Sequence, residues 1–172
     1  MTLRERLQAL KPWRGLDFEL QRQERRYWCW TACAVSVARF YDQGSDWRQC
    51  AVASQTTGRA DCCESGACNF PHYVHRALAT TGNLGERLPE PAELEELVEE
   101  LKRGRPVVVR IAYPSSGHFV VVDGYRPLGI VRVRDPRDEV TKEMSFQRLL
   151  RSYNGIGEWS HTYFTCDGDA HD

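Results

Sequence analysis

Gln23, Cys29, His118 and Asp135 have side chains that could together carry out acyl transfer. Cys29 lies between two tryptophans at the start of an apolar stretch. At a helix N-terminus, unpaired backbone N–H groups and the helix dipole favour the thiolate, which is the nucleophilic form of cysteine. A histidine can act as its general base and acid, and a carboxylate can orient the histidine ring. These residue types predict attack of a sulfur on a carbonyl carbon. The plainer interpretation is that Cys29 is a small buried hydrophobic residue.

Gln23 and His118 favour the catalytic interpretation of Cys29. Gln23 lies in a polar stretch shortly before Cys29, where an amide could donate to the oxyanion that forms when a thiolate attacks a carbonyl. Gln21 could take the same role, and either glutamine could simply be a solvated loop residue. His118 follows a Pro-Ser-Ser-Gly segment and begins an apolar run. From that position it could reach across to another half of the domain, although an isolated histidine is more often half-buried and structural.

The apolar pattern predicts the helices that must position these residues. Residues 30–41 are almost all apolar or small, and the run is too long for a typical strand, so it predicts a largely buried helix. Apolar residues at helical spacing predict an amphipathic helix over residues 94–101, and a shorter helix lies between Pro71 and Gly82. A helix over residues 3–10 would end before Pro12. Residues 16–23 could be extended.

The second half of the chain has the pattern of strands. Residues 106–113, 118–125, 130–135 and 159–164 each predict a strand, and residues 146–150 suit a helical turn. Helices therefore come first and antiparallel strands second. This order predicts an α+β domain made of two halves.

The expected hairpin between residues 118–125 and 130–135 selects a partner for His118. With a turn centred near residues 126–127, His118 lies opposite Asp135 or Pro136, so the Asp135 carboxylate would orient the imidazole. Asp123 is the alternative orienting residue, but strand alternation places it on the opposite face. Asp135 is therefore preferred, although it could also belong to a simple Asp-Pro turn.

The seven cysteines predict covalent cross-links. Seven is an odd number, so at least one thiol is unpaired within the chain. Four of them lie between residues 50 and 68, in a stretch rich in Gly, Ser and Thr, which predicts a loop-rich segment held by two disulfides. Three connectivities are possible for Cys50, Cys62, Cys63 and Cys68, and the adjacent Cys62 and Cys63 are expected to have different partners. The alternative is a zinc site that includes His72 or His75. Cys33 is expected in the core or paired with Cys166, and in a reducing cytosol all of these could be free thiols.

Length and composition exclude several classes of protein. A chain of 172 residues suits one domain, and 23 basic against 24 acidic residues give a formal net charge of −1, unlike a nucleic-acid-binding protein. No apolar run approaches the roughly 20 residues of a membrane-spanning helix, and the charged amino end lacks the apolar core of a signal peptide. We expect a monomer without cofactor or metal that binds neither nucleic acid nor membrane.

The motifs together resemble the papain-like cysteine proteases. They are Gln23-x5-Cys29-Trp30, then a helix of small residues, Gly117-His118-Phe119-Val120, and Arg134-Asp135-Pro136. The likeness runs from about residue 18 to about residue 166 and is greatest to the compact bacterial branch, which includes effector proteases of plant pathogens. The chain also resembles the bacteriocin leader peptidases, more distantly. There are three departures from papain and the cathepsins. The Cys-to-His interval is shorter than their ~130–150 residues, Asp135 stands in place of their asparagine, and the second cysteine that precedes their nucleophile is absent.

The resemblance implies a fold and a role for each residue. The fold would be α+β and papain-like, with the nucleophile helix packed against an antiparallel sheet. Cys29 would be the nucleophile, His118 the general base and acid, Asp135 the orienting residue and Gln23 the oxyanion donor. Trp159 and His161 could shield the His–Asp pair, although a core aromatic and a surface histidine are the plainer interpretations.

The leading functional hypothesis is a cysteine endopeptidase that acts on a protein or peptide. The alternatives are an amidase, deamidase or transglutaminase on the same fold, and a non-catalytic binding module held together by disulfides. Residues 1–17 would form an N-terminal extension and residues 18–172 the catalytic domain. The chain would be secreted or delivered as an effector or toxin without a cleavable signal, and would otherwise be cytoplasmic.

Overall fold

The computed structural model describes residues 2–3 and 14–168 of the chain. The helix expected over residues 3–10 lies almost wholly outside the described residues. The described helices are α2 (Cys29–Tyr41), α3 (Gln49–Thr57), α4 (Val74–Thr81), α5 (Leu94–Lys102), α6 (Phe146–Arg151) and the short 3₁₀ helix η1 (Gly66–Cys68). No helix among these residues is long and apolar enough to cross a membrane.

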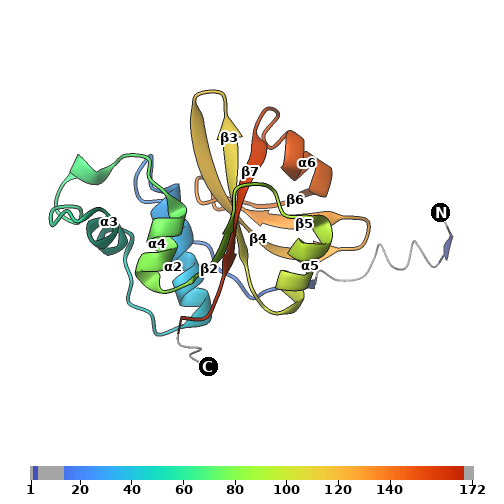
Figure 1. Ribbon diagram of the computed structural model, residues 1–172, viewed down its shortest axis with the longest axis horizontal. Coiled ribbons are helices and arrows are strands. Elements are labelled where there is room, and N and C mark those ends of the chain that lie inside the picture. Colours follow the sequence, from blue (N-terminus) through green and yellow to red (C-terminus); the bar gives the residue numbers. More distant parts are fainter. Residues whose placement is uncertain (1, 4–13, 169–172) are drawn as a thin grey trace.

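A seven-stranded antiparallel sheet forms the centre of the molecule (Figure 1). Its strands are β1 (Arg14–Gly15), β2 (Leu84–Leu88), β3 (Val107–Tyr113), β4 (Ser116–Arg126), β5 (Ile130–Arg134), β6 (Thr141–Ser145) and β7 (Glu158–Thr165). The strand order is β2-β7-β3-β4-β5-β6, and β1 pairs with β4. β7, the last of the described strands, therefore lies inside the sheet.

Strand alternation divides the core between the two faces of the sheet. Val108, Phe119 and Val121 belong to the cluster that contains α2 and α4. Val120 and Val122 belong to a second cluster, which contains residues of α5 and α6. Figure 1 shows α2, α3 and α4 on one side of the sheet and α5 and α6 on the other. The predicted α+β architecture is confirmed, with α2 packed against the sheet.

Five elements are absent from the sequence-based prediction. α3 and η1 form within the segment that was expected to be loop-rich, β1 pairs with β4, and β2 and β6 add strands at the two edges of the sheet. α3 buries only Gln49, Val52 and Ala53, and β6 buries only Met144. Such short segments carry no clear apolar period, because most of their stability comes from the elements that they contact.

The predicted register of the β4–β5 hairpin is wrong. Observed pairs include Val121 with Arg134, and the turn lies at Leu128 and Gly129, which both have positive φ. Continuing that register brings Asp135 opposite Val120 rather than opposite His118. Because residues 118 and 120 project from the same face of β4, Asp135 remains on the face of His118 as its diagonal neighbour. The error therefore does not change the expected partner.

Two disulfides cross-link the helical side of the molecule. They join Cys50 to Cys63 and Cys62 to Cys68, so the adjacent cysteines have different partners as predicted. All four sulfurs are bonded in pairs, which leaves none of them as a thiolate ligand for the zinc alternative. The expected alternative pairing of Cys33 with Cys166 is wrong, since both are free. Cys33 is a core residue whose thiol lies 3.7 Å from the Phe119 carbonyl oxygen.

Candidate active site

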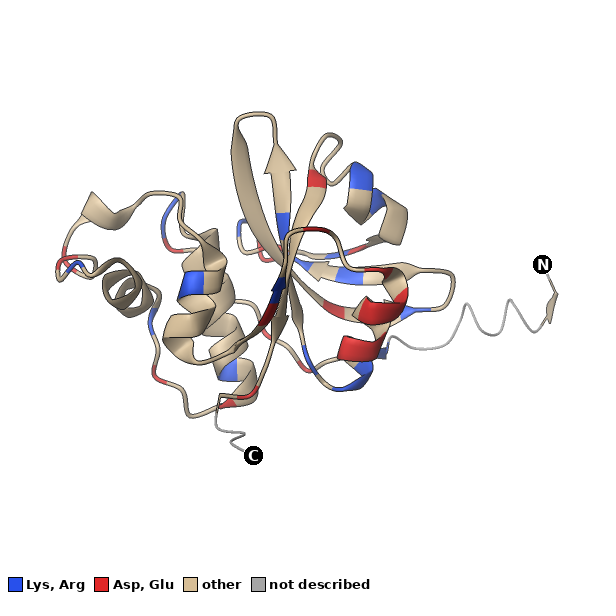
Figure 2. Cartoon of the chain, in the orientation of Figure 1, with Lys and Arg blue, Asp and Glu red and all other residues tan. Residues whose placement is uncertain are grey.

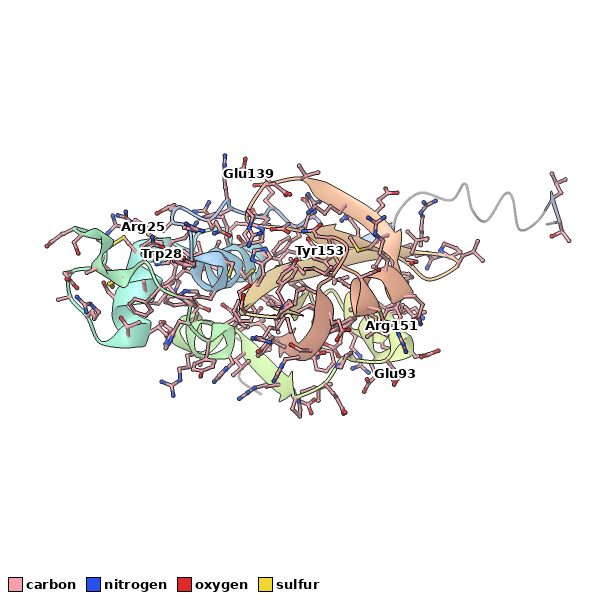
Figure 3. All side chains as sticks on the ribbon, turned by 90° about the horizontal axis from the view of Figure 1, so that it is seen from above. Arg25, Trp28, Glu93, Glu139, Arg151 and Tyr153 are labelled. Carbon is pink, nitrogen blue, oxygen red and sulfur yellow. A yellow bond between two sulfur atoms is a disulfide. The ribbon has the colours of Figure 1, made fainter. Side chains whose placement is uncertain are left out.

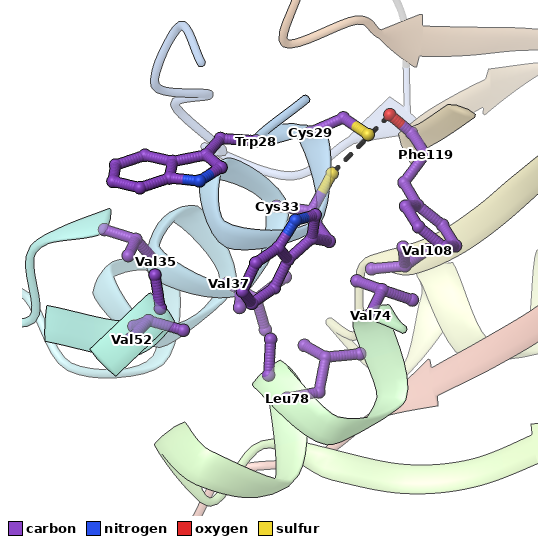
Figure 4. Close-up of a cluster of buried hydrophobic side chains, with 14 of the residues drawn as sticks. Trp28, Cys29, Cys33, Val35, Val37, Val52, Val74, Leu78, Val108 and Phe119 are labelled. Carbon is purple, nitrogen blue, oxygen red and sulfur yellow. Dashed lines mark hydrogen bonds between the residues drawn. The ribbon is translucent and has the colours of Figure 1, made fainter. Parts of the chain in front are cut away.

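Cys29 begins α2 where that helix meets β4. It is only 8% exposed, and Trp28 and Trp30 beside it are fully buried. Cys29 and Cys33 project from the side of α2 that faces Phe119 (Figure 4). No side chain caps the first turn of α2, and that turn contains no acidic residue. Its backbone N–H groups are therefore available to a negative charge.

The segment that follows η1 holds the residues on both sides of Cys29. The indole nitrogens of Trp28 and Trp30 donate to the carbonyl oxygens of Cys68, at 2.8 Å, and of Phe70, at 3.1 Å. The backbone N–H of Tyr27 donates to the Asn69 side chain, at 3.0 Å. Because Cys68 is disulfide-bonded, these contacts tie the nucleophile turn to a cross-linked segment.

His118 lies between Cys29 and Asp135. Its Nε2 is 2.7 Å from Asp135 Oδ1, which leaves Nδ1 for the side-chain hydrogen bond with Cys29. Burial by itself would lower the pKa of His118, but the hydrogen bonds with Asp135 and Cys29 outweigh it and raise that pKa to about 9. The structure thus brings together the sulfur, the imidazole and the carboxylate that the sequence singled out.

Asp135 accepts hydrogen bonds on both of its carboxylate oxygens. Arg137 N–H donates to Oδ1 at 2.9 Å, and the Tyr153 hydroxyl donates to Oδ2 at 2.6 Å. Lys142 Nζ lies 3.5 Å from Oδ2. Burial alone would raise the pKa of Asp135, yet the hydrogen bonds from His118 and Tyr153 hold it well below its ordinary value. Asp135 is therefore ionised and fixed in place behind the imidazole.

Tyr153 is a site residue that sequence reasoning missed. It is fully buried, lies just after α6, and shares Asp135 with His118 (Figure 3 labels it on the sheet side of the molecule). The neighbouring Asp135 charge adds to the effect of burial and raises the pKa of Tyr153, so the hydroxyl keeps its proton and acts as a donor. A tyrosine in a turn carries no local signal of this role, because the contact depends on the tertiary fold.

Asp123 has a different role from Asp135. Its buried carboxylate accepts from Arg132 at 2.7 Å and from Arg134 at 2.8 Å. These two arginines lie on the other face of β5 from Val131 and Val133, which are core residues. Asp123 is thus part of a structural ion-pair network, on the face where alternation predicted it.

Gln23 lines the same cleft as Cys29 and His118, whereas Gln21 does not. The Gln23 amide nitrogen donates to the carbonyl oxygens of Arg25, at 3.0 Å, and Arg26, at 2.6 Å. Its Oε1 is buried without a hydrogen-bond partner among the described residues. The amide is therefore near the nucleophile, with its N–H groups turned towards its own loop.

Gln49, on α3, fixes the loop that carries Gln23. Its Nε2 donates to the carbonyl oxygen of Arg22 at 2.8 Å, and its Oε1 accepts from Glu24 N–H at 3.0 Å. The Thr31 hydroxyl of α2 also lies 3.4 Å from that oxygen. This fully buried amide binds both neighbours of Gln23 and also contacts α2, so it holds the Gln23 loop against the helix that begins at Cys29. The sequence pattern around Gln49 does not indicate this role.

Trp159 and His161 lie on β7, where their surroundings fit a core aromatic and a histidine near the surface. Trp159 is buried in the second core cluster, where it packs against Phe146 and donates to Thr162 Oγ1. His161 is half-buried, with Nδ1 3.0 Å from the Ser160 hydroxyl. His72 and His75 belong to a row of aromatic rings, and burial lowers the pKa of each.

A long cleft runs past Cys29 and His118, with a volume of about 1530 Å³. One wall comes from residues 22–27, 29, 30 and 69–73 of the helical side, and the other from residues 110, 113–119 and 137 of the sheet side. Small-molecule pockets usually have volumes of about 300–1,000 Å³. The cleft therefore has room for several residues of an extended chain.

Comparison with known proteins agrees with this geometry. The model of the Peptidase_C39 like family matches residues 15–161, which include every residue of the candidate site. No curated protein matches the chain. The match supports cysteine peptidase activity in general and a papain-like fold. The chain belongs to the Peptidase_C39 like family.

Proposed function

We propose that the protein is a cysteine endopeptidase in which Cys29 is the nucleophile, His118 the general base and acid, and Asp135 the orienting residue. The observation that carries this proposal is the position of His118, hydrogen-bonded both to Cys29 and to Asp135 at the wall of a long cleft. A pKa of about 9 for His118 means that the imidazolium form is stable at neutral pH.

In the first half of the reaction, the Cys29 thiolate attacks the carbonyl carbon of the scissile peptide bond. A carbon–sulfur bond forms and the carbonyl oxygen takes the negative charge. The oxyanion then collapses, the carbon–nitrogen bond breaks, and the His118 imidazolium gives its proton to the leaving amine. The product is a thioester on Cys29 and a neutral imidazole.

In the second half, His118 takes a proton from water as the water oxygen attacks the thioester carbonyl. The carbon–sulfur bond breaks, the carboxylic acid product leaves, and the thiolate and imidazolium are restored. Asp135 keeps the ring in one orientation throughout and stabilises its positive form.

The oxyanion is stabilised, in this proposal, by the Cys29 backbone N–H and the Gln23 amide. The uncapped first turn of α2 supports the backbone donor. Gln23 acts by exchanging one of its two loop carbonyls, on Arg25 or Arg26, for the oxyanion. This exchange costs little because the freed carbonyl belongs to an exposed residue and can bind water.

A polymeric substrate suits the cleft better than a small amide, because the space extends well beyond the nucleophile. The two disulfides support a setting outside a reducing cytosol, as expected of a secreted or delivered effector. Amidase, deamidase and transglutaminase activity would use the same three residues, and the products distinguish them from peptidase activity.

The test combines labelling of the sulfur with identification of products. Iodoacetamide near neutral pH should modify Cys29 rapidly and at a single site. The protein is also incubated with a pool of unfolded proteins, and new amino termini are identified by mass spectrometry. New termini that vanish in Cys29→Ala and persist in Cys166→Ser support the proposal. Release of ammonia without new termini, or full activity of Cys29→Ala, contradicts it.

A further inference from the structure

The cleft that holds Cys29 and His118 has a charge quite unlike that of the whole chain. Basic and acidic residues nearly balance overall, 23 against 24. The cleft walls, in contrast, carry a single acidic residue, Glu24. The basic residues of the walls are all arginines: Arg22, Arg25, Arg26, Arg110 and Arg137. Positive charge is therefore concentrated where a substrate would lie.

No ion pair within the described part of the chain neutralises these five arginines. Among the described residues, none of them has a carboxylate oxygen within 4.0 Å. Arg132 and Arg134, on the nearby strand β5, both bind Asp123 instead. An unpaired guanidinium group keeps its full attraction for an incoming anion.

Contacts that leave the charge intact hold three of the cleft arginines. Arg25 lies over the Trp28 ring at 5.5 Å and Arg26 over the Tyr27 ring at 5.4 Å, both as cation–π contacts (Figure 3 shows Arg25 beside Trp28). Arg110 donates to the Ser160 hydroxyl at 3.0 Å and passes over Gly117, where an added Cβ would lie 2.7 Å from its guanidinium. Side chains held in this way lose less entropy when they bind a carboxylate.

Acidic residues gather elsewhere. Figure 2 shows Asp and Glu (red) on α5, and the buried side chains of that helix pack on the face of the sheet away from α2.

On the sheet side of the cleft, Arg137 follows the end of β5, and its backbone N–H donates to Asp135, which fixes its position. The arginines thus come from both walls: Arg22, Arg25 and Arg26 before α2, and Arg110 and Arg137 from the sheet side.

We propose that the substrate is an acidic peptide segment, whose Asp or Glu side chains pair with the arginines on both walls while its backbone crosses Cys29. This inference rests on the proposed peptidase function, since it specifies the substrate of that same site. A planar guanidinium matches the two oxygens of a carboxylate. Nucleic acid also carries negative charge, but it offers no acyl group to the nucleophile at the centre of the cleft.

Binding is measured first, because it does not require turnover. The full-length Cys29→Ala variant is titrated with a fluorescein-labelled dodecapeptide of alternating Glu and Ala, and with a matched Gln–Ala peptide. The Glu peptide should bind at least about tenfold more tightly, and the difference should shrink between 50 and 500 mM NaCl as charge is screened. Equal binding of the two peptides, or tighter binding of an oligothymidine of the same length, overturns the proposal.

The arginines are tested with a control for total charge. Arg25→Gln/Arg26→Gln should weaken binding of the Glu peptide about tenfold and leave the Gln peptide unchanged. Arg148→Gln/Arg151→Gln, which removes the same charge from α6 outside the cleft, should leave both affinities within about twofold. An equal loss of affinity for the Glu peptide in the two double variants would mean that net charge alone determines binding. That result overturns the proposal.

The wild-type enzyme separates this inference from the peptidase function. Cleavage of acidic and neutral segments at equal rates would leave the peptidase function standing and overturn the acidic preference. Tight, arginine-dependent binding of the Glu peptide without cleavage of any protein would contradict the peptidase function. The inference that the cleft binds an acidic peptide would then still stand.

Discussion

His118 Nε2 lies 2.7 Å from Asp135 Oδ1, and the two side chains are each only 2% exposed. Water therefore screens this pair poorly, and each partner strongly favours the charged form of the other. The hydrogen bond also fixes which ring nitrogen faces Cys29. Several consequences for activity and stability can be measured.

Asp135→Ala should lower kcat by about 100-fold or more, because the imidazole loses its orientation and the charge that stabilises its protonated form. Asp123→Ala is the matched control: it removes a buried carboxylate that binds Arg132 and Arg134 on the opposite face. It should lower the melting temperature and leave kcat of the folded enzyme within a few-fold. A larger loss of kcat in Asp123→Ala would contradict the assignment of Asp135.

Tyr153→Phe should change the pH profile as well as the rate. The hydroxyl supplies a 2.6 Å hydrogen bond to Asp135 Oδ2 that lowers the pKa of this carboxyl, so without it the pKa of Asp135 rises. We expect a several-fold lower kcat and an acid limit of activity shifted to higher pH. Tyr41→Phe removes a comparable 2.8 Å hydroxyl contact, with Thr165, far from the site. Tyr41→Phe should leave the pH dependence of activity unchanged. An unchanged pH dependence in Tyr153→Phe would exclude a positioning role for Tyr153.

The shifted pKa values also predict how stability and activity depend on pH. The pKa of His118 is raised from 6.5 to about 9, so its contribution to stability is complete below pH 6.5 and is lost as pH rises through 9. The pKa of Asp135 is lowered, so its contribution is present above about pH 4 and is lost as pH falls through the lowered value. Urea unfolding should therefore show greater stability at pH 6 than at pH 9.5.

Activity should fall on the alkaline side near pH 9, where the imidazolium that protonates the leaving amine disappears. Titration of the His118 ring by NMR should give the same midpoint as the alkaline limb of kcat/KM. An alkaline limb near pH 6.5 would mean that Asp135 does not raise the pKa of the His118 imidazole.

The parts of the fold that the sequence predicted are those with a strong local pattern. α2 and strands β3, β4, β5 and β7 have long apolar or alternating runs, so their type was predictable and their bounds were nearly so. β2 and β6 expose most of their residues, and they are strands because a neighbour pairs with them. The hairpin register was wrong because Leu128 adopts a left-handed conformation that its residue type does not suggest.

The candidate site was predictable where residue type determines chemistry. Few residue types can act as a nucleophile, a general base or an orienting carboxylate, and Cys29, His118 and Asp135 are of these types. Strand alternation alone distinguishes Asp135 from Asp123 as the partner of His118. Tyr153 and Gln49 act through contacts with residues distant in sequence, at 18 and 25–27 positions, so no local pattern reveals them.

Gln49→Met tests the support of the Gln23 loop. Loss of the amide removes its hydrogen bonds with Glu24 N–H and the Arg22 carbonyl, which should cost about 0.5–1.5 kcal/mol of the free energy of unfolding for each bond. It should also lower kcat about tenfold, because Gln23 is no longer held near Cys29. Gln55→Met, on the exposed side of α3, is the control and should alter neither quantity. Normal kcat in Gln49→Met would show that the loop needs no such support.

Loss of the Cys62–Cys68 disulfide should change the reactivity of Cys29, although neither cysteine of the disulfide contacts its sulfur. Closing so short a loop contributes about 2–3 kcal/mol to stability, and the segment after it binds Tyr27, Trp28 and Trp30. Cys62→Ser/Cys68→Ser should therefore lower the melting temperature and slow the alkylation of Cys29 by iodoacetamide. Cys166→Ser controls for loss of a cysteine elsewhere. An unchanged alkylation rate in the double variant would show that the segment does not shape the nucleophile.

The position of β7 determines when the sheet can be completed. It is the last of the described strands, yet it lies between β2 and β3, and among the described residues β2 pairs with no other strand. During synthesis, β2 and β3 are therefore without this neighbour until residues 158–165 have been made. Insertion of β7 is the folding step that joins β2 to the rest of the sheet.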